Sequence, residues 1–355
     1  MTTTPPTDFD AEAIGWRPFF QDQLTSEEVA AQSQPARVCR VQARRCHVWS
    51  PRGQHALAIN IFGEAGLPAV GDWLMLDPKK KQPPRRLDRF STLTRQAPGA
   101  KFATQTLAAN VDTLFVVTAC NEDFNVGRIE RYLALAAEAG TQPVLVLTKA
   151  DLADDPRAFV DQAKALDRAL PVECLDTRDP NQLAPLRQRC GPGQTVAALG
   201  SSGVGKSTLI NSLTGAEQAT GDVRADDNKG KHTTTARSLH RMADDGVLVD
   251  LPGIRELQLT EAAAGLDETF AEITALASSC KFRNCTHTNE PGCAIRRALD
   301  TQQLDPRRWE NYRKLLGEQS QFTQTKAAYE KREDRKVIRK KDQRCLDQEH
   351  REDGF

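Results

Sequence analysis

The segment Gly200–Ser207 constrains the fold of this chain more than any other stretch. It reads Gly-Ser-Ser-Gly-Val-Gly-Lys-Ser, follows an apolar run at 195–199 and precedes a predicted helix at 206–213. Its glycines let backbone N–H groups close around phosphates, while Lys206 reaches the β and γ oxygens and Ser207 offers a hydroxyl to Mg²⁺. The pattern therefore predicts a phosphate-binding loop between a strand and a helix of an α/β domain.

Apolar strands alternate with helices in the surrounding sequence. Strands are predicted at 114–118, 144–147, 172–175, 195–199 and 247–249, and helices at 128–139, 156–168, 181–189 and 206–213. This alternation predicts a mostly parallel sheet with helices on both faces. Ligands of such sheets bind at the carboxyl ends of the strands, so motifs that directly follow a strand should meet at one edge.

The motif Asp250-Leu251-Pro252-Gly253 directly follows the strand predicted at 247–249. A carboxylate at Asp250 can hold Mg²⁺ through water, and the Gly253 N–H can meet a γ-phosphate. A plain turn explains the four residues when they stand alone. In a chain with a phosphate-binding loop they indicate a second loop that contacts the nucleotide.

The motif Thr148-Lys149-Ala150-Asp151 ends the strand predicted at 144–147. The Asp151 carboxylate can accept the N1 and N2 protons of guanine, which adenine does not offer, and the Lys149 stem can lie along the ring. A site built for those donors rejects adenine strongly. We therefore predict GTP and GDP as ligands, and the motif argues against the rival classes of P-loop ATPases and kinases.

The polar stretch at 230–235 lies between the helix of the phosphate-binding loop and the next strand. A threonine there would complete the Mg²⁺ shell and sense the γ-phosphate, as a first switch loop does. We favour Thr234, with Thr233 as the alternative. Because Ile254 stands where many GTPases carry a water-orienting glutamine, His232 is the candidate for positioning the water. A structural or RNA-contacting role for His232 stays open.

The predicted site can be stated in full. The nucleotide is contacted by Thr148, Lys149, Asp151, Gly200, Ser201, Ser202, Gly203, Val204, Gly205, Lys206, Ser207, Thr208, Asp250 and Gly253. The predicted catalytic residues are Lys206, Thr234 and His232, and the predicted magnesium ligands are Ser207 and Thr234. Hydrolysis would proceed by in-line attack of water on the γ-phosphate.

The order of these motifs is unusual. The base-reading loop at 148–151 comes first, followed by the phosphate-binding loop, the threonine loop and Asp250–Gly253. In the common arrangement the phosphate-binding loop leads. Because all of these loops lie at one edge of the sheet, a circular permutation preserves the site. The permutation also places the last motif almost directly before the C-terminal region.

Cys280, Cys285, His287 and Cys293 lie within fourteen residues of one another. Three thiolates and an imidazole suit tetrahedral Zn²⁺, and four protein ligands leave no open position for chemistry. We predict one structural zinc ion per chain, with an iron–sulfur cluster or plain buried thiols as the alternatives. The nine cysteines, an odd number in a long chain, argue against a disulfide framework.

The zero net charge of the chain hides an uneven distribution. Residues 37–101 carry thirteen Arg and Lys residues against four acidic ones, whereas residues 1–34 are acidic. Short strands at regular spacing over 35–97 predict a small barrel, either an OB-fold that binds RNA or an SH3-like barrel. A solvated basic face is the alternative to RNA binding.

The chain divides into four predicted regions. We expect a disordered acidic extension at 1–34, an OB-fold RNA-binding domain at 35–97, a permuted GTPase domain at 98–262, and a zinc-binding helical domain with a basic tail at 263–355. No apolar run approaches the roughly 20 residues of a membrane helix, and the N-terminus lacks the pattern of a signal peptide. The expected protein is a cytoplasmic monomer without membrane contact.

With these residues assembled, the chain resembles the bacterial ribosome small subunit-dependent GTPase A family over about 35–298. The resemblance is carried by Gly71-Asp72-Trp73, Thr148–Asp151, Gly200–Ser207, Lys231–Thr234, Asp250–Gly253 and the cysteine cluster with Glu290-Pro291-Gly292. It implies a circularly permuted P-loop GTPase domain of the α/β class with an N-terminal OB-fold β-barrel and a C-terminal helical zinc-binding domain. It also implies a late factor in 30S subunit maturation that binds 16S rRNA near the decoding region and whose GTPase is stimulated by the subunit.

One loop departs from the family pattern. After the strand at 172–175 the family carries a Ser-Ala-like sequence behind the guanine, whereas this chain reads Cys174-Leu175-Asp176-Thr177. The sequence therefore leaves the group that contacts guanine O6 unassigned. A nucleotide-gated RNA-binding scaffold, in which hydrolysis is incidental, shares every motif and is the alternative function.

Overall fold

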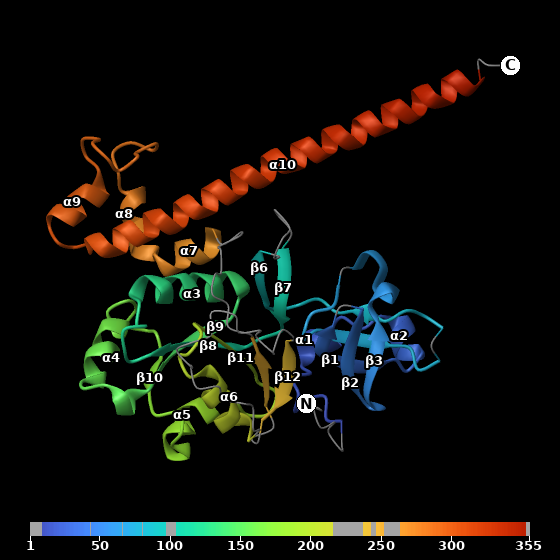
Figure 1. Cartoon of the computed structure of the whole chain (residues 1–355), viewed down its shortest axis with the longest axis horizontal. Helices are drawn as coiled ribbons and strands as arrows, with labels where there is room; N and C mark the ends of the chain where they lie inside the picture. Colours follow the sequence, from blue (N-terminus) through green and yellow to red (C-terminus); the bar gives the residue numbers. More distant parts are fainter. Residues whose placement is uncertain are drawn as a thin grey trace, which may run out of the picture.

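The computed structural model describes residues 9–42, 44–65, 67–79, 81–96, 104–215, 237–242, 246–251 and 263–352, with the backbone alone for 63–65, 330 and 332–352. Figure 1 shows a small β-domain beside a central α/β domain, with the C-terminal helices lying over one face of the latter. Among the described residues, no helix combines the length and the apolar character needed to cross a membrane.

The small β-domain is built from five strands. They are β1 (Gln34–Gln42), β2 (Arg45–Ser50), β3 (Gly53–Ala58), β4 (Trp73–Leu76) and β5 (Arg85–Arg86), with a 3-10 helix at Ile59–Ala65 after β3. All neighbouring pairs are antiparallel, in the order β3-β2-β1-β4-β5. The fourth strand returns to pair with the first, which is the Greek-key connection of the partly open OB-fold barrel. This strand order agrees with the predicted OB-fold.

The Gly71-Asp72-Trp73 segment has a structural role in this domain. A side chain at Gly71 would meet the Ala109 carbonyl oxygen at 2.1 Å, so only glycine fits there. Asp72 is fully buried and pairs with the Arg89 guanidinium at 2.6 Å. Trp73 is also fully buried. These residues fix the start of β4 against Arg89 and Ala109, which precede the central domain in the chain.

Residues 9–34 are ordered, contrary to the prediction of a disordered extension at 1–34. They contain helices α1 (Pro18–Gln21) and α2 (Ser26–Ala30). Phe20 is fully buried in the main core, Arg17 pairs with Asp112 at 2.7 Å, and Glu28 pairs with Arg85 at 2.6 Å. The acidic composition suggested a solvated chain, but Arg17 and Glu28 have partners far away in the sequence. Residues 1–8 lie outside the described part.

The central domain contains one mixed sheet. Its strands are β8 (Thr113–Ala119), β9 (Gln142–Thr148), β10 (Val172–Cys174), β11 (Thr195–Gly200), β12 (Ser238–Arg241) and β13 (Val247–Asp250). The order is β10-β9-β8-β11-β13-β12, and all pairs are parallel except β12 with β13. Within β8, Leu114 and Val116 pack into one core cluster while Phe115 and Val117 pack into another. Burial on both faces explains the continuous apolar runs of these strands.

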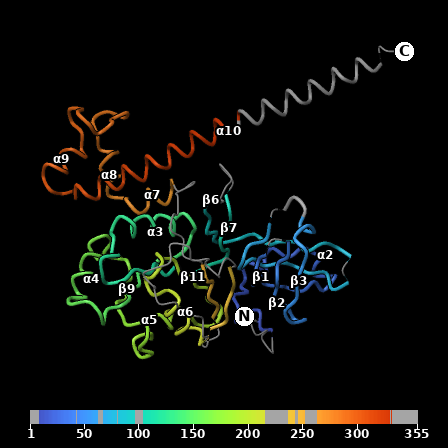
Figure 2. The backbone as a smooth tube through the Cα atoms, in the orientation of Figure 1, coloured from blue at the N-terminus to red at the C-terminus, as the bar shows by residue number. Residues whose placement is uncertain are grey.

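Helices cover both faces of this sheet, as the alternation of elements predicts. They are α3 (Val126–Ala139), α4 (Pro156–Lys164), α5 (Ala184–Arg187) and α6 (Lys206–Thr214). In Figure 1, α3 lies over one face and α5 and α6 over the other. Strands β6 (Thr92–Gln96) and β7 (Thr104–Ala109) pair with each other between the two domains, as the tube in Figure 2 shows. The predicted domain boundary at residues 97–98 falls between these paired strands.

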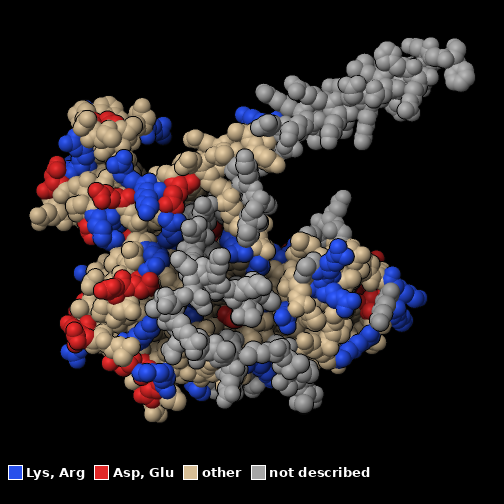
Figure 3. Space-filling view, viewed as in Figure 1, with Lys and Arg blue, Asp and Glu red and all other residues tan. Residues whose placement is uncertain are grey.

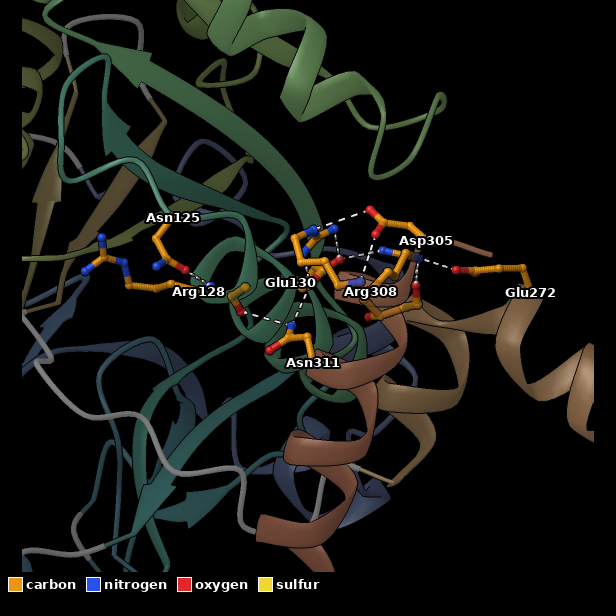
Figure 4. Close-up of polar contacts among 10 residues, drawn as sticks. Asn125, Arg128, Glu130, Glu272, Asp305, Arg308 and Asn311 are labelled. Atoms are coloured by element: carbon orange, nitrogen blue, oxygen red, sulfur yellow. Dashed lines mark hydrogen bonds and ion pairs between the residues drawn. The ribbon is translucent and has the colours of Figure 1, made fainter. Parts of the chain in front are cut away.

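The C-terminal part packs on α3 through buried charges (Figure 4). It comprises α7 (Ala263–Thr269), α8 (Ala271–Ser278), α9 (Ala294–Asp300) and α10 (Pro306–Glu352). The fully buried carboxylate of Glu130 on α3 accepts hydrogen bonds from Arg308 at 2.9 Å, from Arg307 at 3.2 Å and from Asn311. Arg308 also pairs with Glu272 on α8. This network joins three helices at one point.

Candidate nucleotide-binding site and metal cluster

Three of the predicted loops converge at one edge of the central sheet. Strands β9, β11 and β13 run parallel and end at Thr148, Gly200 and Asp250. Because parallel strands place their carboxyl ends at the same edge, the base-reading loop, the phosphate-binding loop and Asp250 come together. The structure thus brings motifs that are separated by about a hundred residues of sequence into one site.

The phosphate-binding loop needs its glycines. Gly203 and Gly205 have φ values of 82° and 92°, in the left-handed region that disfavours other residues. A side chain at Gly200 would meet the Val117 carbonyl oxygen at 2.2 Å. Helix α6 then begins at Lys206, so its free N–H groups face the loop. Local conformation and packing together produce a cradle for an anion.

Lys206 is held inside this loop. Its ammonium donates to the carbonyl oxygens of Gly200 at 2.6 Å and Ser201 at 2.5 Å. Burial lowers the pKa of Lys206 to about 8, and the nearby Asp250 carboxylate opposes that shift. The amine is therefore desolvated and lies near Asp250, a carboxylate that could bind Mg²⁺ together with the phosphates of a nucleotide. Ser207 is exposed at the start of α6.

Two contacts that the sequence did not reveal support the loop. The Thr148 hydroxyl donates to the Val204 carbonyl at 2.5 Å, so the end of β9 is tied directly to the phosphate-binding loop. Burial raises the pKa of the Tyr132 phenol of α3, and the nearby Ser201 side chain opposes that shift. Neither partner can be found from local pattern, because each contact joins segments that are distant in sequence.

The base-reading loop is shaped by a 3-10 turn over Ala150–Leu152. Lys149, which precedes the turn, has a φ of 56°, a left-handed conformation that costs energy in a residue with a side chain. The Asp151 carboxylate pairs with Arg178 at 2.5 Å. Arg178 follows β10 in the loop that departs from the family pattern, and no local motif predicts that it lies beside Asp151.

Several predicted site residues lie outside the described part of the chain. They are His232, Thr233, Thr234 and Gly253. Their roles remain predictions. Asp250, the first residue of the Asp250–Gly253 motif, is described at the end of β13.

The four predicted metal ligands come together between α8 and α9. The ligand atoms of Cys280, Cys285, His287 and Cys293 all lie within 4.8 Å of one another. His287 Nδ1 is 3.5 Å from Cys293 Sγ and 3.6 Å from Cys280 Sγ. A tetrahedral ion with bonds of about 2.3 Å to sulfur requires ligand separations of this size. The cluster could therefore hold a metal ion.

Glu290 holds the loop that carries His287. Its carboxylate accepts backbone N–H groups from Thr286 at 2.8 Å, Thr288 at 3.0 Å and Asn289 at 3.1 Å. Hydrogen bonds from the side chain and backbone of Thr286 hold the pKa of Glu290 at about 2, well below its usual range. The loop therefore has its own scaffold, which explains why Glu290 accompanies the cysteines.

The fold and the site define a P-loop GTPase whose motifs are circularly permuted. The model of the RsgA GTPase family matches residues 86–260. The small ribosomal subunit biogenesis GTPase RsgA of Mesorhizobium japonicum is 49% identical over 314 residues, which are 87% of this chain and 90% of that protein. RsgA 2 of Vibrio vulnificus is 47% identical over 90% of each chain. The chain belongs to the RsgA GTPase family, and the expected GTPase activity is confirmed.

Solved structures agree on the fold. The crystal structure of YjeQ from Thermotoga maritima matches 80% of this chain and 99% of its own, with a TM-score of 0.58 and 22% identity. That of YloQ, described as a circularly permuted GTPase, matches 82% of this chain and 96% of its own, with a TM-score of 0.57 and 22% identity. The predicted fold class is confirmed.

Proposed function

We propose that this protein hydrolyses GTP during the maturation of the small ribosomal subunit. The observation that carries the proposal is the meeting of the loops after β9, β11 and β13 at one edge, in a chain 49% identical to a protein named for small ribosomal subunit biogenesis. The same likeness supports the small ribosomal subunit as the partner. Binding to 16S rRNA and a cytoplasmic, monomeric state belong to the proposal as the sequence analysis expects them.

The roles in hydrolysis that we propose come from the sequence motifs, and for Lys206, Ser207 and Asp250 also from their places in the structure. Lys206, already desolvated, neutralises charge that develops on the phosphate oxygens. Ser207 and Thr234 would hold Mg²⁺, with Asp250 binding it through water. The ion supplies charge neutralisation between the phosphates when it is bound. Water attacks the γ-phosphate in line, and His232 orients it.

Substitution of His232 tests the assignment of the water-positioning residue. His232→Ala should remove most of the turnover that small subunits stimulate, while GTP-dependent binding to the subunit is retained. Lys206→Ala should weaken both the stimulated turnover and the GTP-dependent binding to the subunit, because it removes a phosphate contact. Full stimulation in His232→Ala would show that a group of the ribosomal subunit positions the water.

Substitution of Asp151 tests guanine recognition. Asp151→Asn should shift preference from guanosine toward xanthosine nucleotides, because xanthine carries an acceptor where guanine carries its N2 donors. Competition binding with GDP, ADP and xanthosine diphosphate measures the change. ADP binding within about tenfold of GDP in the unaltered protein, or roughly 1.4 kcal/mol, would contradict the assignment.

We propose that the cluster of Cys280, Cys285, His287 and Cys293 holds one structural Zn²⁺. The support is the donor set itself, since three sulfur atoms and one imidazole nitrogen match the preference of zinc for tetrahedral N/S sites. The ion would replace a hydrophobic core that the short segment between α8 and α9 cannot build.

We propose that the small β-domain binds rRNA through its exposed basic residues. Lys and Arg side chains gather over this domain in Figure 3, and Arg44, Arg45 and Arg52 are exposed there. Arg37 takes no part, because it is fully buried and donates to the Thr195 hydroxyl at 2.8 Å. Burial lowers the pKa of Arg37 to about 9. Its role is to join β1 to the start of β11.

A further inference from the structure

The loop after β10 is fixed in place by side-chain contacts. The Thr177 carbonyl accepts the Ser212 hydroxyl of α6 at 2.8 Å. The Asp176 N–H donates to Gln182 at 2.9 Å, and the Asp176 carboxylate accepts the Arg178 N–H at 2.9 Å. The loop is therefore tied to the helix that begins at the phosphate-binding loop.

The Arg178 side chain lies between two carboxylates. Its Nε is 3.0 Å from Asp176 Oδ1, and its Nη2 is 3.1 Å from Asp176 Oδ2. The same Nη2 is 2.5 Å from Asp151 Oδ2. The two bonds to Asp176 anchor the guanidinium from its own loop, so its position beside Asp151 does not depend on the Asp151 contact alone.

Guanine carries three polar groups in a row on one edge. N2 and N1 carry protons, and O6 is an acceptor next to N1. If the Asp151 carboxylate takes the N1 and N2 protons, the neighbouring group meets O6. The guanidinium of Arg178 lies directly beside Asp151, and it carries only donors.

We propose that Arg178 is a specificity-determining residue that donates to O6 of the bound guanine, beside the Asp151 carboxylate. This inference rests on the proposed role of Asp151 as the base reader. It supplies the O6 contact that the departure at Asp176-Thr177 left unassigned. Arg178 also acts against adenine, whose N6 amino group would place donors against donors at the same position.

Dissociation constants for diphosphates measured with the full-length protein test the proposal. Arg178→Ala should weaken GDP binding about tenfold, equal to roughly 1.4 kcal/mol. The loss should be the same for inosine diphosphate, which keeps O6, and clearly smaller for 6-thio-GDP, whose sulfur is a weaker acceptor. Arg178→Lys should recover only part of the loss, because it keeps the charge but not the planar fork.

Arg168→Ala is the matched control, since it removes the same charge from an exposed residue before β10 instead of after it. It should leave all of these constants unchanged. Arg178→Ala would overturn the proposal if GDP binding changed less than twofold, or if it became tighter. Tighter binding would mean that Arg178 only occupies Asp151 in the empty site.

Asp151→Asn separates this inference from the assignment on which it rests. If Asp151→Asn shifts preference to xanthosine diphosphate while Arg178→Ala has no effect, the role of Arg178 alone is wrong. If Asp151→Asn leaves the preference for GDP intact, the base-reading site itself is wrong, and the inference about Arg178 is overturned with it.

Discussion

Glu130 should be the residue whose loss most clearly releases the C-terminal helices from the central domain. Its side chain is completely buried and meets Arg307, Arg308 and Asn311. Glu130→Gln keeps the shape but removes the charge. It leaves Arg308, whose side chain is only 11% exposed, with its remaining contacts to Glu272 and to the Thr269 carbonyl.

The magnitude follows from the burial of the partners. Removing one member of a buried ion pair costs about 3–5 kcal/mol. We expect the lower end, about 3 kcal/mol, because Arg307 is 44% exposed and can be solvated. Opening of the C-terminal helices should then become roughly a hundredfold more frequent.

Hydrogen exchange measures this opening region by region. Amides of α9 and of the first turns of α10 should exchange about a hundredfold faster in Glu130→Gln, while those of β8 and β9 keep their rates. Glu318→Gln is the control, because its pair with Arg131 is partly exposed on both sides and should contribute less than about 1 kcal/mol. Unchanged exchange in α9 and α10, or equal acceleration in β8 and β9, would show that Glu130 does not hold the C-terminal helices on the central domain.

Three further predictions concern the nucleotide, the metal and RNA. Phosphate oxygens should raise the pKa of Lys206 from about 8, so GTP binding takes up a proton at and above about pH 8 and weakens as the pH rises beyond that value. Calorimetry in two buffers that shows no proton uptake contradicts this. Cys285→Ser should lose one zinc per chain by elemental analysis and keep GDP binding, with Cys39→Ser in β1 as the control. Iron, or zinc retained in Cys285→Ser, contradicts it. The slope of the logarithm of the subunit-binding constant against the logarithm of salt concentration reports the number of phosphate contacts. Replacing Arg44 and Arg45 by Ala should lower that number by about two, and an unchanged slope excludes them from the interface.

The central domain could be predicted from the sequence because its signals are local. Strands β8, β9, β11 and β13 are largely buried, so they appear as apolar runs, and three of the motifs directly follow such a run. The phosphate-binding loop needs glycine at Gly203 and Gly205 for reasons of backbone conformation alone. The cysteine cluster is equally local, since its ligands lie within fourteen residues.

The contacts that sequence could not predict are long-range. Residues 9–34 are acidic enough to suggest disorder, yet Arg17 and Glu28 find partners at Asp112 and Arg85. Arg37 stands in a basic run that suggests an RNA contact, but packing between two domains buries it. In each case the residue type is the usual one for a surface, and only the tertiary fold changes its environment.

GTP turnover with and without purified small ribosomal subunits shows whether hydrolysis is coupled to the small subunit. We predict slow hydrolysis of GTP by the protein alone, a marked increase when small subunits are added, and no hydrolysis of ATP in either case. Turnover of GTP that small subunits leave unchanged would contradict the coupling of hydrolysis to subunit maturation, and hydrolysis of ATP at a similar rate would contradict the nucleotide site itself.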